Sequence, residues 1–318
     1  MKRTRGWAAH VQATGAVLLI LGYLQDVFIT LQAMSVHRDN KGLWNLSFDP
    51  SAVSKWWAVV LFLLVVLGIS AFFGGYLFKQ FRGRPIHEPR SRLTLRDMLL
   101  SFGWVGVLLF GGVFAFYSMA LDLVPQWFRE SPAASALGGV SMQIAAIVAI
   151  PLYYRKSLSE IGLRRPVISK RMIGYVLMFF VFMYASSILT NIVGSWMGIN
   201  TDSYREQSIS QELHGALKGG WWLAMLPMFA TSIIAPVGEE LLFRGVLQST
   251  LTAKYGSWTG VFGSAFLFAL IHADPVLFLP IFLIGLLFAA LYRITGSIWA
   301  PIWLHVLNNL YASLMDLF

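Results

Sequence analysis

Apolar stretches of about 20 residues recur along the whole chain, separated by short polar or basic segments. Each is long enough to cross a hydrocarbon layer of roughly 30 Å as a helix. Helices are the natural solution because a backbone in lipid has to satisfy its own hydrogen bonds. The pattern therefore predicts an all-α fold, a polytopic transmembrane helical bundle of about eight or nine spans. The candidate spans cover residues 13–34, 56–78, 98–121, 134–153, 173–197, 222–253, 257–272, 275–292 and 296–316.

The composition supports this prediction and excludes several other classes of protein. Of the 318 residues, 57% are hydrophobic and only 12% are charged, whereas soluble domains carry about 25% charged residues. There is no cysteine, which excludes disulfides, thiolate nucleophiles and thiolate metal ligands. Any metal ion would need His, Asp or Glu ligands.

The net charge of +9 is better explained by topology than by a nucleic-acid partner. Most of the 24 Lys and Arg residues fall on one side of the predicted spans, which the positive-inside rule assigns to the cytoplasm. They lie at the N-terminus, in segments 79–96 and 155–171, and at positions 244, 254 and 293. We expect an integral multi-pass protein with a cytoplasmic N-terminus, in the cell membrane if the host is bacterial. The first span lacks a clear cleavage site, so we expect it to stay in the mature protein.

Polar residues of the types that can catalyse reactions or bind metal ions are concentrated in the second half of the chain. Residues 1–165 hold about four spans and two basic loops, and are expected to form an N-terminal transmembrane scaffold region. Residues 166–318 are expected to form the functional region. Its longest polar stretch, 198–220, is interpreted as an external loop with a surface helix, or alternatively as a lid over the site.

Three ionisable residues lie together in an otherwise apolar span: Glu239, Glu240 and Arg244. Ionisable groups at membrane depth indicate a functional site. Glu240 and Arg244 are four residues apart, with the acid on the N-terminal side, so they are expected to pair on one helix face. Glu239 is rotated by about 100° from Glu240 and needs a partner from another helix.

Two later histidines are candidate partners. If the helices are straight, Glu239 and His272 lie at matching distances, roughly 25 Å, from the turn at residues 255–256. His305 is followed at i+3 and i+4 by Asn308 and Asn309, so a histidine and an amide share one helix face. Spacing alone does not choose between the two asparagines.

These side chains support two kinds of hydrolytic site. A carboxylate, two histidines and an amide could activate a water and stabilise an oxyanion. Alternatively, Glu239, His272 and His305 could ligate a metal ion, with Zn2+ as the candidate and a water as the fourth ligand. The sequence leaves both open. It contains no HExxH motif and no GxSxG motif in a suitable context.

Three motifs in this region resemble those of a known family. EExxxR is matched at Glu239–Arg244, FxxxH at Phe268–His272 and HxxxN at His305–Asn309, and the longer stretch GEELLFRG also fits. They are similar to the motifs of the CAAX proteases and bacteriocin-processing enzymes, which include prenyl-protein endopeptidases. A lead-in typical of the family is matched at residues 158–166.

The resemblance implies a set of roles. Glu239 and His272 would activate the hydrolytic water, and His305 and Asn309 would form the oxyanion site. Glu240, Arg244 and Phe268 would support its geometry. The family is usually classed as metallopeptidase, although a metal-free glutamate mechanism is an alternative.

The expected function is that of an intramembrane endopeptidase that acts on a membrane-tethered protein or peptide. The substrate could be prenylated at a CAAX-type terminus, but the sequence does not require this. Bacteriocin processing or immunity is a further role within the family. The alternative is a non-catalytic membrane scaffold that regulates partner membrane proteins with the same fold. A secondary transporter would be expected to show paired broken spans in two related halves, and the sequence shows none.

Overall fold

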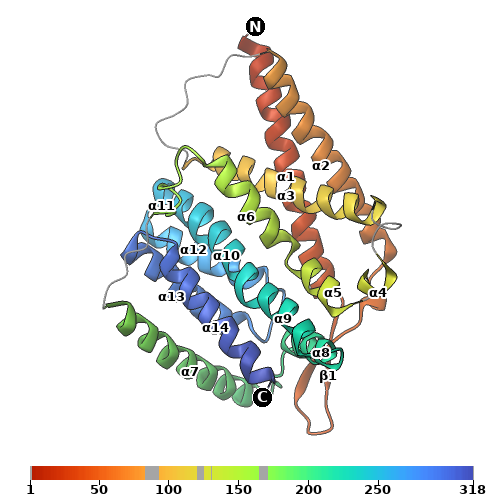
Figure 1. Cartoon of the computed structure of the whole chain (residues 1–318), viewed down its shortest axis with the longest axis vertical. Helices are drawn as coiled ribbons and strands as arrows, with labels where there is room; N and C mark the ends of the chain where they lie inside the picture. The colour runs from red at the N-terminus through yellow and green to blue at the C-terminus, as the bar shows by residue number, and fades with distance from the viewer. Residues whose placement is uncertain (1, 83–92, 120–124, 130, 165–170, 318) are drawn as a thin grey trace.

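The computed structural model of the chain describes residues 2–82, 93–119, 125–129, 131–164 and 171–317. The part before residue 165 contains one hairpin and a series of helices (Figure 1). In chain order these are α1 (Lys2–Gln32), β1 (Met34–Arg38), β2 (Trp44–Phe48), the 3-10 turn η1 (Pro50–Ala52), α2 (Lys55–Arg82), α3 (Leu95–Met119), α4 (Gln126–Arg129), α5 (Pro132–Gly139) and α6 (Ser141–Tyr153).

The part after residue 170 is helical throughout its regular structure. It contains α7 (Arg171–Met197), α8 (Tyr204–Lys218), α9 (Trp221–Phe229), η2 (Ala230–Ile234), α10 (Ala235–Glu240), η3 (Leu241–Gln248), α11 (Ser249–Tyr255), α12 (Ser257–Leu270), α13 (Phe278–Thr295) and α14 (Trp299–Leu317). Here η2 and η3 are π-helical segments.

The protein is a polytopic helical membrane protein, as predicted. Among the described residues, six helices are long and apolar enough to cross a membrane, and two shorter apolar helices, 141–153 and 257–270, accompany them. Helices cover most of each predicted span, residues 120–121 of the third span lie outside the described residues, and the count of eight or nine crossings stays a prediction. The stretch 134–153 is not one helix, since α5 and α6 meet at Val140.

The first three long helices pack closely through small residues. A Cβ on Gly75 of α2 would lie 2.6 Å from the backbone nitrogen of Gln12 in α1, so the two backbones approach as small residues allow in membrane helices. Leu19, Phe72 and Leu100 form a buried cluster between α1, α2 and α3. Because α3 also contacts α6, this group is joined to the rest of the bundle. The predicted regional boundary at 165/166 lies outside the described residues, and the division into two regions stays a prediction.

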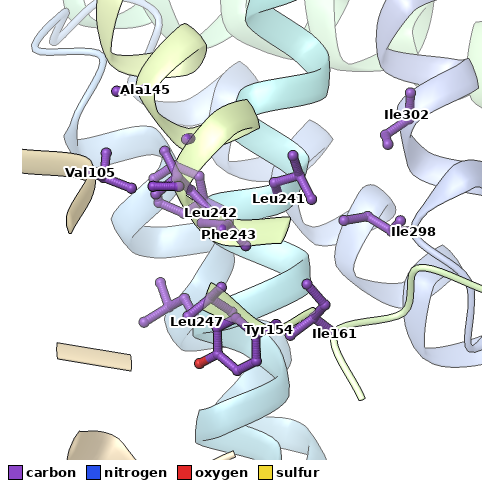
Figure 2. Packing of buried hydrophobic residues seen from close by; sticks show 14 of the residues in the cluster. Val105, Ala145, Tyr154, Ile161, Leu241, Leu242, Phe243, Leu247, Ile298 and Ile302 are labelled. Atoms are coloured by element: carbon purple, nitrogen blue, oxygen red, sulfur yellow. The ribbon is translucent and has the colours of Figure 1, made fainter. Parts of the chain in front are cut away.

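The centre of the bundle is a continuous helical rod from Trp221 to Tyr255, made of α9, η2, α10, η3 and α11. Its buried residues pack against α3, α6 and α14 in the largest apolar cluster of the described chain (Figure 2). Leu241, Leu242, Phe243 and Leu247 supply the rod's share of this core, directly beside the acidic pair. The core therefore fixes the rotation of the rod, and with it the direction of Glu239 and Glu240.

A small cap lies at the end of the bundle near the C-terminus (Figure 1). It consists of the β1–β2 hairpin and α8. Trp44 of β2 bonds to the segment before α8 (Trp44 N to Gly198 O 2.7 Å, Asn200 N to Trp44 O 2.7 Å), and Phe48 stacks on Tyr204 with ring centroids 5.3 Å apart. The predicted surface helix in the loop 198–220 is thus confirmed.

Candidate active site

A π-helical turn precedes the acidic pair and is completed by Asn309. The Ala235 N–H bonds to the carbonyl of Ala230, five residues back. In the same register the carbonyl of Thr231 faces Pro236, which has no N–H to donate. The side-chain nitrogen of Asn309 in α14 donates to this carbonyl at 3.0 Å. Asn309 therefore binds the rod eight residues before Glu239, and one of its two amide hydrogens is already used.

Glu240 has two side-chain partners. The Arg244 Nη1 donates to Glu240 Oε1 at 3.0 Å, and both side chains are fully buried. The predicted pair is thus confirmed. His305 Nδ1 lies 2.9 Å from the same oxygen. The guanidinium is held further by the carbonyl of Gly285 at 3.1 Å and lies over the Phe268 ring, 4.4 Å from its centroid.

Glu239 has partners from two other helices, as predicted, but no Lys or Arg partner in the described chain. Its Oε1 accepts a hydrogen bond from Gln143 Nε2 of α6 at 3.0 Å, and its Oε2 lies 3.7 Å from His305 Nε2. The residue is only 4% exposed, and within the described chain no Lys or Arg forms an ion pair with it. Glu239 is therefore a buried carboxylate without a Lys or Arg partner among the described residues.

Sequence reasoning missed Gln143, which belongs to the region predicted as scaffold. A polar residue in the apolar run SMQIAAIVAIPLY was the signal that could have identified it. Its close approach depends on Gly238, where a Cβ would lie 2.5 Å from the Cα and Cβ of Gln143. The glycine thus allows α6 and α10 to come close enough for the hydrogen bond.

His272 lies in the turn after α12, which ends at Leu270. Its Nδ1 is 2.7 Å from the carbonyl of Phe268. A neutral ring donates through Nδ1–H there, which leaves Nε2 as a free acceptor. Phe268 contacts both histidines, with ring centroids 4.8 Å from His272 and 5.8 Å from His305.

The structure brings most of the predicted site residues together. Glu239, Glu240, Arg244, Phe268 and His305 form one network of direct contacts. His272 joins it through Phe268, and in the described part of the chain no hydrogen bond or ion pair links His272 to Glu239. Their cooperation through a water stays a prediction, since a base can act through one water.

The predicted metal ligands do not form a ligand set in this arrangement. Among the described residues, no group of three or more His, Asp or Glu side chains is placed to hold a metal ion. His305 is directed at Glu240 through Nδ1, and His272 is directed at a backbone carbonyl through its own Nδ1. The metal, with Zn2+ as candidate, stays a prediction, and no step below passes through it.

Comparison with known proteins finds similarity in the second half of the chain. Residues 220–311 match the family model of the Rce1-like type II CAAX prenyl endopeptidases, and this segment contains Glu239, His272, His305 and Asn309. A Bacillus subtilis (strain 168) protein described as "Putative membrane peptidase YdiL" is 28% identical over 139 residues. That match covers 44% of this chain and 54% of the relative, so the chain spans about half of the relative's length. No solved structure matches the chain. Residues 220–311 of the chain are therefore similar to the Rce1-like type II CAAX prenyl endopeptidases.

Proposed function

We propose that the chain is an intramembrane endopeptidase that hydrolyses a peptide bond in a membrane-tethered protein or peptide. The observation that carries the proposal is the difference between the two buried acids. Glu240 is paired with Arg244 and His305, whereas Glu239 has only a neutral amide and one edge of an imidazole. A buried carboxylate costs several kcal/mol when it has no cationic partner, and such a cost is typical of a group kept for reaction.

We infer that the nucleophile is a water. A water held between the free oxygen of Glu239 and Nε2 of His272 would lose a proton to one of these bases as its oxygen attacks the substrate carbonyl. The carbonyl π electrons move to oxygen and form a tetrahedral oxyanion. When the C–N bond breaks, the electron pair goes to nitrogen, and the proton taken from water passes to the leaving amine.

We expect His305 and Asn309 to stabilise that oxyanion. Glu240 accepts a hydrogen bond from Nδ1 of His305, so Nε2, which lies beside Glu239, would donate to the oxyanion only when the ring carries both protons as an imidazolium. The amide nitrogen of Asn309 keeps one hydrogen after its bond to Thr231. Preorganised donors of this kind are each worth about 10²–10³-fold in kcat.

The test is cleavage by purified protein in liposomes. The substrates are a quenched farnesylated CAAX peptide and a library of membrane-tethered peptides, and the variants are Glu239→Gln and His272→Ala. Asp316→Asn is the matched control, because Asp316 is an exposed carboxylate on the same helix as His305. We expect cleavage by wild type and the control and none by the two site variants. If folded wild-type protein cleaves no peptide, the scaffold alternative replaces the peptidase.

We also propose that the N-terminus is cytoplasmic and the cap is on the opposite side. Because the chain has no native cysteine, single cysteines report topology without background. Lys41→Cys in the hairpin should react with an impermeant maleimide in intact cells, and Lys254→Cys at the end of α11 should react only after permeabilisation. The reverse pattern would overturn this orientation.

A further inference from the structure

The start of α8 contacts the turn that carries His272 at three successive positions. The Ser203 hydroxyl donates to Asp274 Oδ2 at 2.6 Å. The Tyr204 hydroxyl donates to the carbonyl of Ala273 at 3.2 Å, and Arg205 Nη1 donates to the carbonyl of His272 at 3.3 Å. Residues 203, 204 and 205 thus contact residues 274, 273 and 272, respectively, so the two segments run in opposite directions. We call residues 203–205 the clamp.

The turn held by the clamp has an unfavourable backbone. Ala273 has φ = 52°, a left-handed conformation that costs a residue with a Cβ about 1–3 kcal/mol and persists only when its surroundings impose it. Asp274 supplies part of that constraint, since its Oδ1 accepts from the backbone N–H groups of Val276 and Leu277 at 2.9 and 3.2 Å. The clamp supplies the rest from outside the turn.

The clamp is itself fixed by the cap. Ser203 is the N-cap of α8, and its oxygen accepts from the backbone N–H groups of Arg205 and Glu206 at 3.1 Å each. Ser203 and Asp274 are 1% and 3% exposed, so water does not compete for their bond. Tyr204 is held by its stacking on Phe48 of the hairpin.

We propose that the clamp positions His272 for catalysis, so that Tyr204 and Arg205 act as positioning residues of the site. The inference rests on the proposed peptidase function. His272 is held from two directions. Phe268 holds the ring through Nδ1, and Arg205 holds the backbone of the same residue. Without the clamp the strained turn relaxes, and Nε2 leaves the position it needs beside the water. The cap is thereby part of the active site rather than a passive loop.

The test compares the double variant Tyr204→Phe/Arg205→Met with wild type. Tyr204→Phe removes the hydroxyl and keeps the stacking ring, and Arg205→Met removes the donors and keeps side-chain length. Gln207→Ala is the matched control, because Gln207 is exposed in the same turn of α8. Arg205→Lys keeps a donor and should restore part of the lost activity.

Two measurements are made on full-length protein in liposomes. The first is amide hydrogen exchange over residues 270–277, which we expect to be at least about tenfold faster in the double variant because two hydrogen bonds are lost. The second is the split between kcat and KM. We expect kcat to fall about tenfold to a hundredfold, as for a small misplacement of a reacting group, with KM unchanged.

Each outcome decides a different statement. Unchanged exchange and unchanged kcat in the double variant would overturn the clamp while leaving the peptidase intact. Faster exchange with unchanged kcat would make the clamp a structural contact only and would also overturn its positioning role. If wild type cleaves nothing although exchange responds, the peptidase function fails, and the role in catalysis fails with it. Should the double variant misfold in size-exclusion chromatography, Tyr204→Phe alone is measured in the same way.

Discussion

Adding one methyl group at Gly238 should disable the site without changing a polar residue. In Gly238→Ala the new Cβ would lie 2.5 Å from Cα and Cβ of Gln143 and 2.7 Å from its carbonyl oxygen. Carbon atoms pack at about 3.5–4.0 Å, so α6 and α10 have to separate by about 1 Å. The Gln143–Glu239 hydrogen bond, 3.0 Å long, would then exceed the range of a real hydrogen bond.

The magnitude follows from three effects. Overpacking costs about 1–3 kcal/mol, and loss of a hydrogen bond to a charged group costs about 1.5–3 kcal/mol. Alanine in place of glycine returns up to about 1 kcal/mol in a helix. We therefore expect a loss of about 2–5 kcal/mol in the free energy of unfolding, with a fall in kcat.

Thermal unfolding in detergent and the cleavage assay measure the two effects. The control is Gly111→Ala in α3, where an added Cβ meets nothing within 4 Å. Gln143→Ala removes the hydrogen-bond donor to Glu239 without adding a methyl group between α6 and α10. It should lower kcat to the level of Gly238→Ala. The double variant should be no slower than either, because both changes remove one interaction. If Gly238→Ala is as stable and active as Gly111→Ala, this reasoning is wrong.

The remaining predictions concern charge, capping, pH and metal. Glu240→Gln leaves the Arg244 guanidinium buried without a carboxylate and should destabilise by about 3–5 kcal/mol, whereas Glu239→Gln should lose activity with little change in melting temperature; equal destabilisation would contradict the division of roles. Asn309→Leu leaves a helix carbonyl unpaired and should cost about 1–3 kcal/mol in thermal unfolding, and a wild-type melting temperature would argue against that bond. Burial and three nearby carboxylates raise the pKa of Glu206, so its contribution to stability is present below its unfolded pKa and is lost as the pH rises through the unfolded and then the folded pKa. Glu206→Gln should therefore raise the melting temperature at about pH 7 but not at about pH 4; a gain at both would refute the titration. Exhaustive chelation tests the predicted metal: a loss of cleavage that Zn2+ restores would support it, and an unchanged cleavage rate would support the metal-free use of Glu239 and His272.

The helical bundle and the acidic pair could be predicted from the sequence because both depend on local rules. Apolar runs define the helices wherever lipid is the solvent, and the spacing of four residues brings Glu240 and Arg244 together on one turn. The motif positions also indicated which side chains gather. Glu239, His305 and Asn309 come from segments that pack as direct neighbours around η2 and α10.

The depth match between Glu239 and His272 could not be predicted as reliably, because it assumes straight α-helices. The central rod contains π-helical turns at η2 and η3, and α12 ends before His272. Equal numbers of residues from the turn at 255–256 therefore do not imply equal depths of Glu239 and His272 in the membrane. The η2 turn involves a proline in the rod and an amide 78 positions away in the chain, which no local pattern reveals.

The contacts of Gln143 and of the clamp are long-range in the same sense. Gln143 is 96 positions from Glu239, and Ser203 is 71 positions from Asp274. Each side chain alone resembles an ordinary polar residue of a span or a loop. Only the packing of α6 on α10, and of the cap on the bundle, gives them a role.

The close approach of Gly238 to Gln143 also constrains how such a protein can evolve. Any larger residue at position 238 requires α6 to move, and any movement of α6 changes what can reach Glu239. Positions 143 and 238 therefore cannot drift independently, and we expect them to vary together across relatives. Sequence changes in the segment that contains Glu239 should then be accompanied by changes in α6, although α6 contains none of the three motifs.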